Sequence, residues 1–292
     1  MNILFQIDGG LGKSIMATAM VKVIKKRYKN ANLIVVTAYP DVFLNNPSVS
    51  KVYNTNNING FYLKYVKDQK CKIFVEDPYR NEDFILDKPI KLLKTWCELY
   101  GLRYNNEQPE LHLTQPELDY FKPYYTTDKP ILAIQTNGGP AGIGYQYAWT
   151  RDIPEPTILE LINHYKDDYT IIHIKREDQK IYPDTMQALD GYRSIAILLL
   201  LSSKRLLMDS FAQHMAAALN KKSTVCWVST KPEIFGYKIH DNIKSNPFTK
   251  EPSLHEAAYQ PFALSQDIHS IPYNDLKEIF STNKIIESIN NQ

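Results

Sequence analysis

A short segment combines residue types that suit phosphate binding. Residues 206–208 are an apolar run, Asp209 and Ser210 follow, and an alanine-rich stretch starts at residue 212. Asp and Ser are preferred helix N-caps because their oxygens accept hydrogen bonds from the first free backbone N–H groups. The segment therefore predicts strand, turn and helix, with a helix N-terminus that can seat a phosphate or diphosphate. The alternative is a βα unit in which both residues only cap the helix.

Two glycine-containing turns follow predicted strands. Residues 2–7 form an apolar run that ends in Asp8-Gly9-Gly10-Leu11-Gly12, and residues 131–136 form another that leads into the glycine-rich residues 137–144. Glycine allows the backbone to approach a ligand closely, although a tight βα turn needs small residues in any case. The candidate ligand-binding residues in these turns are Gly10, Gly12, Asn137 and Gly138.

Two familiar nucleotide motifs are absent from the first turn. Gly12-Lys13-Ser14 resembles the end of a Walker phosphate loop, but the first required glycine would fall on Ile7. The dinucleotide fingerprint fails because its third glycine position is Ile15 and no acidic residue ends the second predicted strand. A P-loop ATPase and an ordinary dehydrogenase are therefore disfavoured.

Lys175 and Arg176 follow a predicted strand in the second half of the chain. At the carboxyl edge of a parallel sheet, Lys175 would lie where a phosphate binds. A simple surface charge at a strand end would give the same pattern, so both interpretations stay open.

Strand and helix patterns alternate along the chain, which predicts an α/β fold of parallel sheets with helices on both faces. The repeated strand-to-glycine opening suggests two similar domains, each with its ligand edge at the strand ends. We expect an amino-terminal domain over residues 1–128, a carboxyl-terminal domain over 129–272, and a terminal helix at 273–292 packing back on the first domain. The predicted helices include residues 14–28, 87–101, 154–165, 195–202 and 212–219.

Composition indicates a globular protein without a strong global field. The chain has 292 residues, 43% hydrophobic, with a formal net charge of +2, which does not call for nucleic acid or an anionic membrane as partner. The three separated cysteines favour a reducing compartment. The apolar run 195–201 is shorter than the roughly 20 residues of a membrane span. We therefore expect a cytoplasmic protein without a transmembrane segment. Five basic residues on one predicted helix are expected to form a solvated face: Lys22, Lys25, Lys26, Arg27 and Lys29.

The segment Asp209-Ser210-(three residues)-His214-Met-Ala-Ala-Ala-Leu219 resembles glycosyltransferase family 9, the lipopolysaccharide heptosyltransferase-like group. That family carries Asp-Ser/Thr-Gly-x-x-His-x-Ala-Ala-Ala-Leu. Residues 3–28 and 45–53 are similar to its opening and to its Asn-Pro-x-Val stretch, and Arg151 stands where it has a basic residue before a helix.

The resemblance implies a GT-B-like fold, with two Rossmann-like domains whose parallel sheets face a central cleft. The carboxyl domain would hold a nucleotide-diphosphate sugar and the amino domain an acceptor hydroxyl, for inverting, metal-independent transfer without a further cofactor. Negative charge that grows on the departing diphosphate would be stabilised by hydrogen-bond donors preorganised around it. The implied donors are the N–H groups after Asp209, the Ser210 hydroxyl, Arg151 and Lys175. His214 would lie one turn into the helix, where it reaches phosphate or ribose or simply packs.

Three departures from the family pattern change these expectations. Lys13 occupies the place of the likely catalytic base, so Asp8 in the same loop becomes the substitute candidate. Phe211 replaces the glycine after Asp-Ser, where it crowds the phosphate seat or stacks on a sugar or base. Lys175-Arg176 replaces a Gly-Gly pair. The heptosyl donor and the lipopolysaccharide acceptor are therefore not implied.

Two further functions stay open. One is a non-catalytic nucleotide-sugar binding protein that lost its base at Lys13, and the other is a sugar-nucleotide epimerase of the same fold. For a transferase, the acceptor would be a glycan, a lipid or another hydroxyl compound, with nucleic acid disfavoured, and the protein could lie at the inner face of a membrane.

Overall fold

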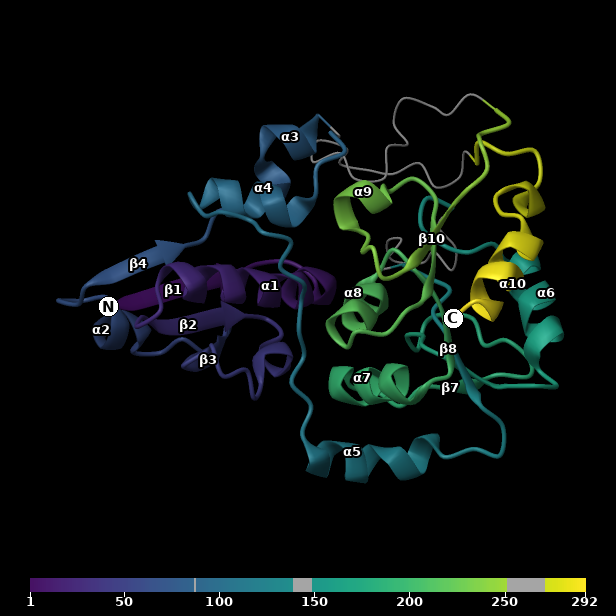
Figure 1. The fold of residues 1–292 in the computed structure, drawn as a ribbon, viewed down its shortest axis with the longest axis horizontal. Coiled ribbons are helices and arrows are strands. Elements are labelled where there is room, and N and C mark those ends of the chain that lie inside the picture. The colour runs from purple at the N-terminus through teal and green to yellow at the C-terminus, as the bar shows by residue number, and fades with distance from the viewer. Residues whose placement is uncertain (87, 139–148, 251–270) are drawn as a thin grey trace. The chain divides into compact units, whose positions relative to one another are not determined.

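The structure is a computed structural model that describes residues 1–86, 88–138, 149–250 and 271–292. It divides into two compact units, Met1–Glu117 and Leu118–Gln292, and each contains one sheet of parallel strands with helices (Figure 1). The predicted α/β class is therefore confirmed. Within the described ranges, no helix has the length and apolarity needed to cross a membrane.

The first unit is built on a four-stranded sheet in the order β3-β2-β1-β4, with β1 at the point where the strand order reverses. All of its strand pairs are parallel. Its elements are β1 (Asn2–Ile7), α1 (Leu11–Arg27), β2 (Asn32–Thr37), η1 (Pro40–Phe43), β3 (Lys51–Asn54), α2 (Phe61–Tyr65), β4 (Cys71–Phe74), η2 (Pro78–Arg80), α3 (Glu82–Ile85) and α4 (Leu92–Leu99), with α5 (Gln115–Phe121) at its boundary.

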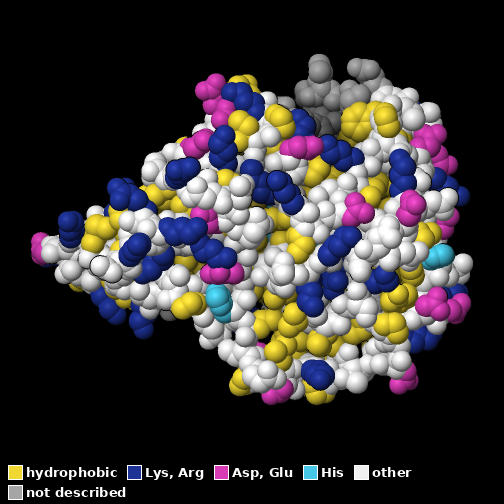
Figure 2. Space-filling model, in the orientation of Figure 1, with side chains coloured by type: hydrophobic (Ala, Val, Ile, Leu, Met, Phe, Trp, Pro, Cys, Tyr) yellow, Lys and Arg dark blue, Asp and Glu magenta, His cyan; other side chains and the backbone are white. Residues whose placement is uncertain are grey.

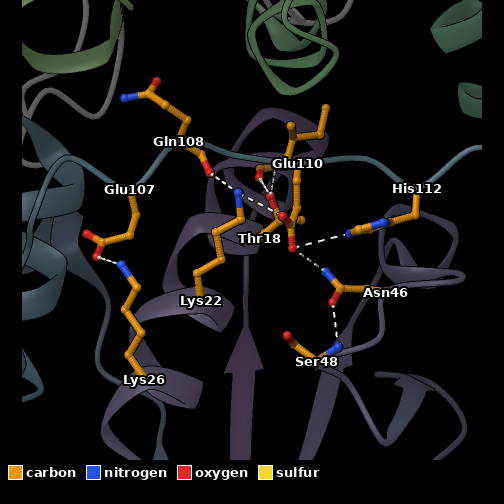
Figure 3. Close-up of polar contacts among 10 residues, drawn as sticks. Thr18, Lys22, Lys26, Asn46, Ser48, Glu107, Gln108, Glu110 and His112 are labelled. Atoms are coloured by element: carbon orange, nitrogen blue, oxygen red, sulfur yellow. Dashed lines mark hydrogen bonds and ion pairs between the residues drawn. The ribbon is translucent and has the colours of Figure 1, made fainter.

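Helix α1 begins three residues before the predicted start, and residue 87, the predicted start of a helix to 101, lies outside the described residues. The lysines of α1 are not simply a solvated face. Lys26 Nζ lies 2.7 Å from Glu107 Oε1, and Lys22 Nζ lies 2.7 Å from Glu110 Oε2. Glu110 also accepts a hydrogen bond from Asn46 (Figure 3). These contacts fix an extended segment along α1, which the sequence pattern did not indicate.

Charged side chains of both signs are interspersed on the surface. On the face shown in Figure 2, Lys and Arg side chains are scattered among Asp and Glu side chains. The mixture agrees with the net charge of +2.

The second unit is built on a six-stranded parallel sheet in the order β10-β9-β8-β5-β6-β7. The chain runs outward from β5 to β7 and then returns to the other side of β5 with β8, so the strand order reverses between β5 and β8. Its elements are η3 (Lys122–Tyr125), β5 (Ile131–Ile134), α6 (Glu155–Tyr165), β6 (Thr170–His173), β7 (Met186–Gln187), α7 (Tyr192–Leu201), β8 (Lys204–Met208), α8 (Phe211–Ala218), β9 (Thr224–Trp227), α9 (Pro232–Phe235), β10 (Asp241–Lys244), η4 (Leu276–Glu278) and α10 (Thr282–Asn290).

The terminal helix α10 belongs to the core of the second unit. Ile285 and Ile289 are fully buried and pack in one cluster with Leu132, Ile158 and Leu206 of that unit. The apolar face of α10 therefore packs within its own unit, whereas the sequence had led us to expect the helix against the first domain. The apolar side chains on one face of β5 and β8 must be shielded from water, and α10 packs against them.

Candidate functional site

The carboxyl ends of β5 and β8 bring the two segments singled out in the sequence together. Gln135, Thr136 and Asn137 follow β5, Asp209 and Ser210 follow β8, and the two strands pair in parallel. Ligands of open α/β sheets bind at such a reversal of strand order, because the loops beyond the two strands separate there. Residues 139–148 of the predicted glycine-rich turn lie outside the described residues.

A buried segment, residues 149–153, crosses the ends of several strands. Ile153 N–H donates to the Thr136 carbonyl at 2.9 Å, and Ser229 N–H, after β9, donates to the Thr150 carbonyl at 3.1 Å. The segment therefore ties the ends of β5 and β9 together and places Arg151 and Asp152 at the carboxyl edge.

Asp152 fixes the backbone after β5. It is 3% exposed, and its carboxylate accepts hydrogen bonds from Gly138 N–H and from Asn137 Nδ2, each at 2.8 Å. Thr136 Oγ1 donates to Asn137 Oδ1 at 2.9 Å, which fixes the orientation of that amide. The sequence pattern did not single out Asp152, because Arg151 and Pro154 accounted for the resemblance of this segment to the family.

Gly138 is held where no other residue fits. A Cβ atom added there would lie 2.9 Å from the Cβ and Nε atoms of Arg151 and from Cε of Met208. The close approach of Arg151 to the β5 loop therefore requires glycine, which gives a physical reason for one of the predicted binding residues.

Arg151 reaches across to the turn after β8. Its guanidinium donates to the Asp209 carbonyl, and Nη2 lies 3.6 Å from Asp209 Oδ2. The Arg151 side chain is 20% exposed, so part of it reaches solvent. The structure thus brings Arg151 and Asp209 together.

Ser210 occupies the N-cap position of α8 but does not cap it. Its backbone is extended, and its side chain makes no hydrogen bond to the helix. Ser210 Oγ instead accepts a hydrogen bond from Gln135 Nε2 at 3.2 Å. The predicted capping role of this side chain is therefore wrong, because a neighbouring strand supplies a competing donor. The first-turn N–H groups of α8 consequently receive no cap from Ser210.

Several buried polar atoms at or near this edge lack a hydrogen-bond partner among the described residues. Buried polar groups are almost always hydrogen-bonded, so a group of unpartnered ones needs an explanation, such as a bound ligand or water. The atoms concerned are Gln135 Oε1, Trp149 Nε1, His173 Nδ1 and Thr230 Oγ1.

His173, the last residue of β6, is 1% exposed, and its Nε2 lies 2.9 Å from Thr136 Oγ1. Burial, and to a smaller extent the charge of Lys175, lowers the pKa of His173 to about 4. Since Thr136 Oγ1 donates to Asn137, His173 Nε2 must be the donor in this pair, and Nδ1 carries the lone pair.

We expect His173 to make stability depend on pH. A histidine in the unfolded chain titrates near pH 6.5, so between pH 6.5 and about 4 the unfolded state binds more protons. Stability is therefore lost as the pH falls through this window, by up to about 3 kcal/mol. Urea unfolding at pH 7, 5.5 and 4 should show a smaller acid-induced loss in His173→Gln than in the wild type. Equal losses in the two proteins would contradict the assignment.

The other predicted residues of the second unit lie in different surroundings. His214 is 4% exposed, and its Nδ1 lies 2.9 Å from the Tyr237 hydroxyl, as in a packed helix histidine. Lys175 Nζ donates to the Arg176 carbonyl at 2.7 Å. Phe211 is the first residue of α8 and is half-buried.

In the first unit, the loop after β1 contains the predicted Asp8 and Gly10, and the predicted Gly12 lies in the first turn of α1. Asp8 is exposed and accepts hydrogen bonds from Gln6 Nε2 at 3.1 and 3.4 Å. Gly10 is the N-cap residue of α1, and space around it is open. The residue that requires glycine is Gly9, whose φ is +101° and whose added Cβ would lie 3.3 Å from Lys13 Cδ. The sequence pattern did not single out Gly9, because the requirement for glycine there depends on the position of the Lys13 side chain in the folded protein.

Lys13 lies in the first turn of α1 and is buried. Its ammonium lies 2.8 Å from Asp77 Oδ1, beyond the end of β4, and it faces the rings of Tyr79 and Trp96 at 5.1 and 5.5 Å from their centroids. Among the described residues, no group of three or more His, Cys, Asp or Glu side chains could hold a metal ion.

No protein-family model matches the chain, and no curated protein matches it significantly. Solved structures do match. A glycosyl transferase family 9 protein from Veillonella parvula superposes with a TM-score of 0.68 at 10% identity, covering 99% of this chain and 96% of that one. The E. coli ADP-heptose lps heptosyltransferase II gives 0.66 at 15% identity, covering 100% and 98%. The iron-containing dodecameric glycosyltransferase TibC from enterotoxigenic E. coli gives 0.63 at 11% identity, covering 99% and 75%.

These likenesses extend over nearly the whole chain, but the identities are low. They show that the chain has the fold of these glycosyltransferases, which confirms the GT-B-like architecture implied by the resemblance. Residues in the same fold can serve different reactions, so function has to be argued from the site.

Proposed function

We propose, from the premise that the chain has the fold of the family 9 glycosyltransferases, that it transfers a sugar from a nucleotide-diphosphate sugar to an acceptor hydroxyl. The second unit would bind the donor at the carboxyl ends of β5 and β8. The single observation that supports this most is the set of buried polar atoms at the strand ends that lack a partner among the described residues, one of them on Gln135, which contacts Ser210 at the start of α8. A nucleotide would supply their missing partners.

The proposed transfer depends on stabilising the negative charge that develops on the leaving diphosphate. As the bond between the sugar and the diphosphate breaks, its electron pair leaves with the diphosphate, and positive groups held in place stabilise the developing charge. The N–H groups at the start of α8 and the guanidinium of Arg151 are such groups, and Lys175 is a further candidate. Gly138 lets Arg151 approach the β5 loop, and Asp152 fixes that loop. These residues would therefore orient the leaving group.

The first unit would bind the acceptor. The acceptor oxygen attacks the anomeric carbon on the face opposite the leaving diphosphate, so the configuration inverts, and its proton passes to a carboxylate. Asp8 is the carboxylate that the sequence predicts for this task. The proposal includes no metal and no cofactor beyond the donor, a glycan or lipid acceptor, and a cytoplasmic location.

A screen of nucleotide sugars tests the proposal. A ligand that binds only the folded protein raises its melting temperature by mass action, equivalent to about 2.7 kcal/mol at one hundred times its Kd. We expect one of UDP-, GDP- or ADP-sugars to stabilise the protein, CMP-sugars to serve as the monophosphate control, and mass spectrometry to detect the transferred sugar.

The alternatives give different outcomes. Stabilisation by a nucleoside diphosphate without turnover of any donor would indicate a non-catalytic binding protein. Free sugar without an acceptor, together with a changed epimer, would indicate an epimerase. No stabilisation by any nucleotide sugar would contradict the proposal.

A further inference from the structure

The first unit carries a carboxylate, Asp77, that the sequence patterns did not single out. The strand order of its sheet reverses between β1 and β4, which is where ligands of open α/β sheets bind. Asp8 follows β1 and Asp77 follows β4 at this same edge. Both carboxylates therefore lie at the expected ligand edge of the unit.

Asp77 is held in one orientation by two donors to the same oxygen. Oδ1 lies 2.8 Å from Lys13 Nζ and accepts a hydrogen bond from Tyr79 N–H at 3.0 Å. No described residue donates to Oδ2, and the Asp77 side chain is 27% exposed. One oxygen is thus anchored while the other is available to a ligand.

Asp8 differs in each of these respects. It is exposed, and a single neutral side chain, Gln6, contacts both of its oxygens. No described cation lies within ion-pair distance of it. No described residue fixes Asp8 as Lys13 and Tyr79 fix Asp77.

The side chain of Lys13 is enclosed by its neighbours, which restricts the positions that its ammonium can take. Its side chain is 5% exposed, passes close to Gly9, and faces the rings of Tyr79 and Trp96. An ammonium is attracted to the faces of aromatic rings. The ion pair between helix α1 and the loop after β4 is therefore well defined in its geometry.

We infer that Asp77 is the general base of this protein, with Oδ2 taking the proton of the acceptor hydroxyl and Lys13 positioning the carboxylate. The inference rests on the proposed glycosyl transfer. In the step, the acceptor oxygen forms its bond to the anomeric carbon, the bond from that carbon to the diphosphate breaks with its electron pair, and the hydroxyl proton moves to Asp77 Oδ2. Lys13 touches Asp77 rather than the substrate, so it is a positioning residue.

The test uses the nucleotide sugar that stabilises the protein most in the screen, with p-nitrophenyl glycosides as acceptors. A positioned general base contributes about 10²- to 10⁴-fold to the rate, so Asp77→Asn should lower kcat by at least about 100-fold. Donor binding, measured by calorimetry with the matching nucleoside diphosphate, should stay within about 3-fold because that ligand binds the other unit. Asp8→Asn should lower kcat much less. Glu98→Gln, an exposed carboxylate on α4, is the matched control.

Lys13 variants test its positioning role. Lys13→Met removes the charge at similar length and should lower kcat by at least about 10-fold without a change in donor binding. Lys13→Arg keeps the charge and should recover part of this loss, which a purely structural role in packing would not produce. Should Asp77→Asn fail to fold, full activity of Lys13→Met would by itself overturn the inference.

The outcomes separate the two proposals. If Asp77→Asn keeps kcat within about 3-fold of wild type, or if Asp8→Asn loses more activity than Asp77→Asn, Asp77 is not the base and the glycosyltransferase proposal stands. If the wild-type protein turns over no donor in the screen, both proposals are wrong.

Discussion

Replacing Asp152 with alanine is expected to lower the free energy of unfolding by about 3 to 5 kcal/mol. The substitution removes the carboxylate acceptor of the buried Gly138 N–H and of the half-buried Asn137 Nδ2. Each unsatisfied buried group costs about 1 to 3 kcal/mol, and bonds to a charged acceptor lie at the upper end of that range. The loss would be a large part of the 5 to 15 kcal/mol that stabilises a typical domain.

Urea denaturation followed by fluorescence measures this effect. Asp178→Ala is the matched control, because Asp178 is an exposed carboxylate of the same unit that pairs only with the exposed Arg176 among the described contacts. Its effect should stay within about 0.5 kcal/mol. A loss below about 1 kcal/mol in Asp152→Ala would mean that other groups replace the carboxylate.

Replacing Arg151 with alanine is expected to weaken nucleoside diphosphate binding by about 10- to 100-fold. The estimate corresponds to the loss of one charge-assisted hydrogen bond of about 1.5 to 3 kcal/mol. Arg151 also donates to the Asp209 carbonyl, so its removal loosens the turn that leads into α8. Both effects act in the same direction on an anion bound at the start of that helix.

Calorimetry with the nucleoside diphosphate that stabilises the protein most measures the affinity. Arg151→Lys retains the charge but not the planar fork of donors, so it should lie between wild type and Arg151→Ala. Lys284→Ala, on the exposed side of α10, controls for the loss of one positive charge. Unchanged affinity in a folded Arg151→Ala variant would remove Arg151 from the site.

Local sequence patterns predicted the helices and strands, because the residue types and spacings that favour them lie close together in the sequence. The apolar run and the alanine-rich stretch around Asp209 became β8 and α8, each shifted by one or two residues at its start. The alternation of strands and helices was enough to predict parallel sheets, since helices that connect parallel strands cover the two faces of the sheet. The resemblance at residues 209–219 then led to the correct fold although identity to the solved structures is only 10 to 15%.

Side-chain roles were predicted less well because they depend on partners distant in the sequence. Ser210 has the residue type of an N-cap, but Gln135 on the adjacent strand competes for its hydroxyl. The local sequence around Asp77 is typical of a loop, and its role depends on an ion pair with Lys13, which lies far earlier in the chain. The sequence pattern predicts a solvated face for Lys22 and Lys26. In the structure they form ion pairs with the segment at 107–110, which lies along α1.

The sequence by itself therefore determined the α/β class and the strand–turn–helix at Asp209, because periodicity and helix propensity depend on neighbouring residues. The resemblance at residues 209–219 indicated the fold. Only the tertiary structure decided that Asp152 holds the β5 loop, that Gly138 must be glycine, and that Lys13 is paired with Asp77. These features arise where strand ends meet at a reversal of strand order, and that meeting is set by how the whole sheet assembles.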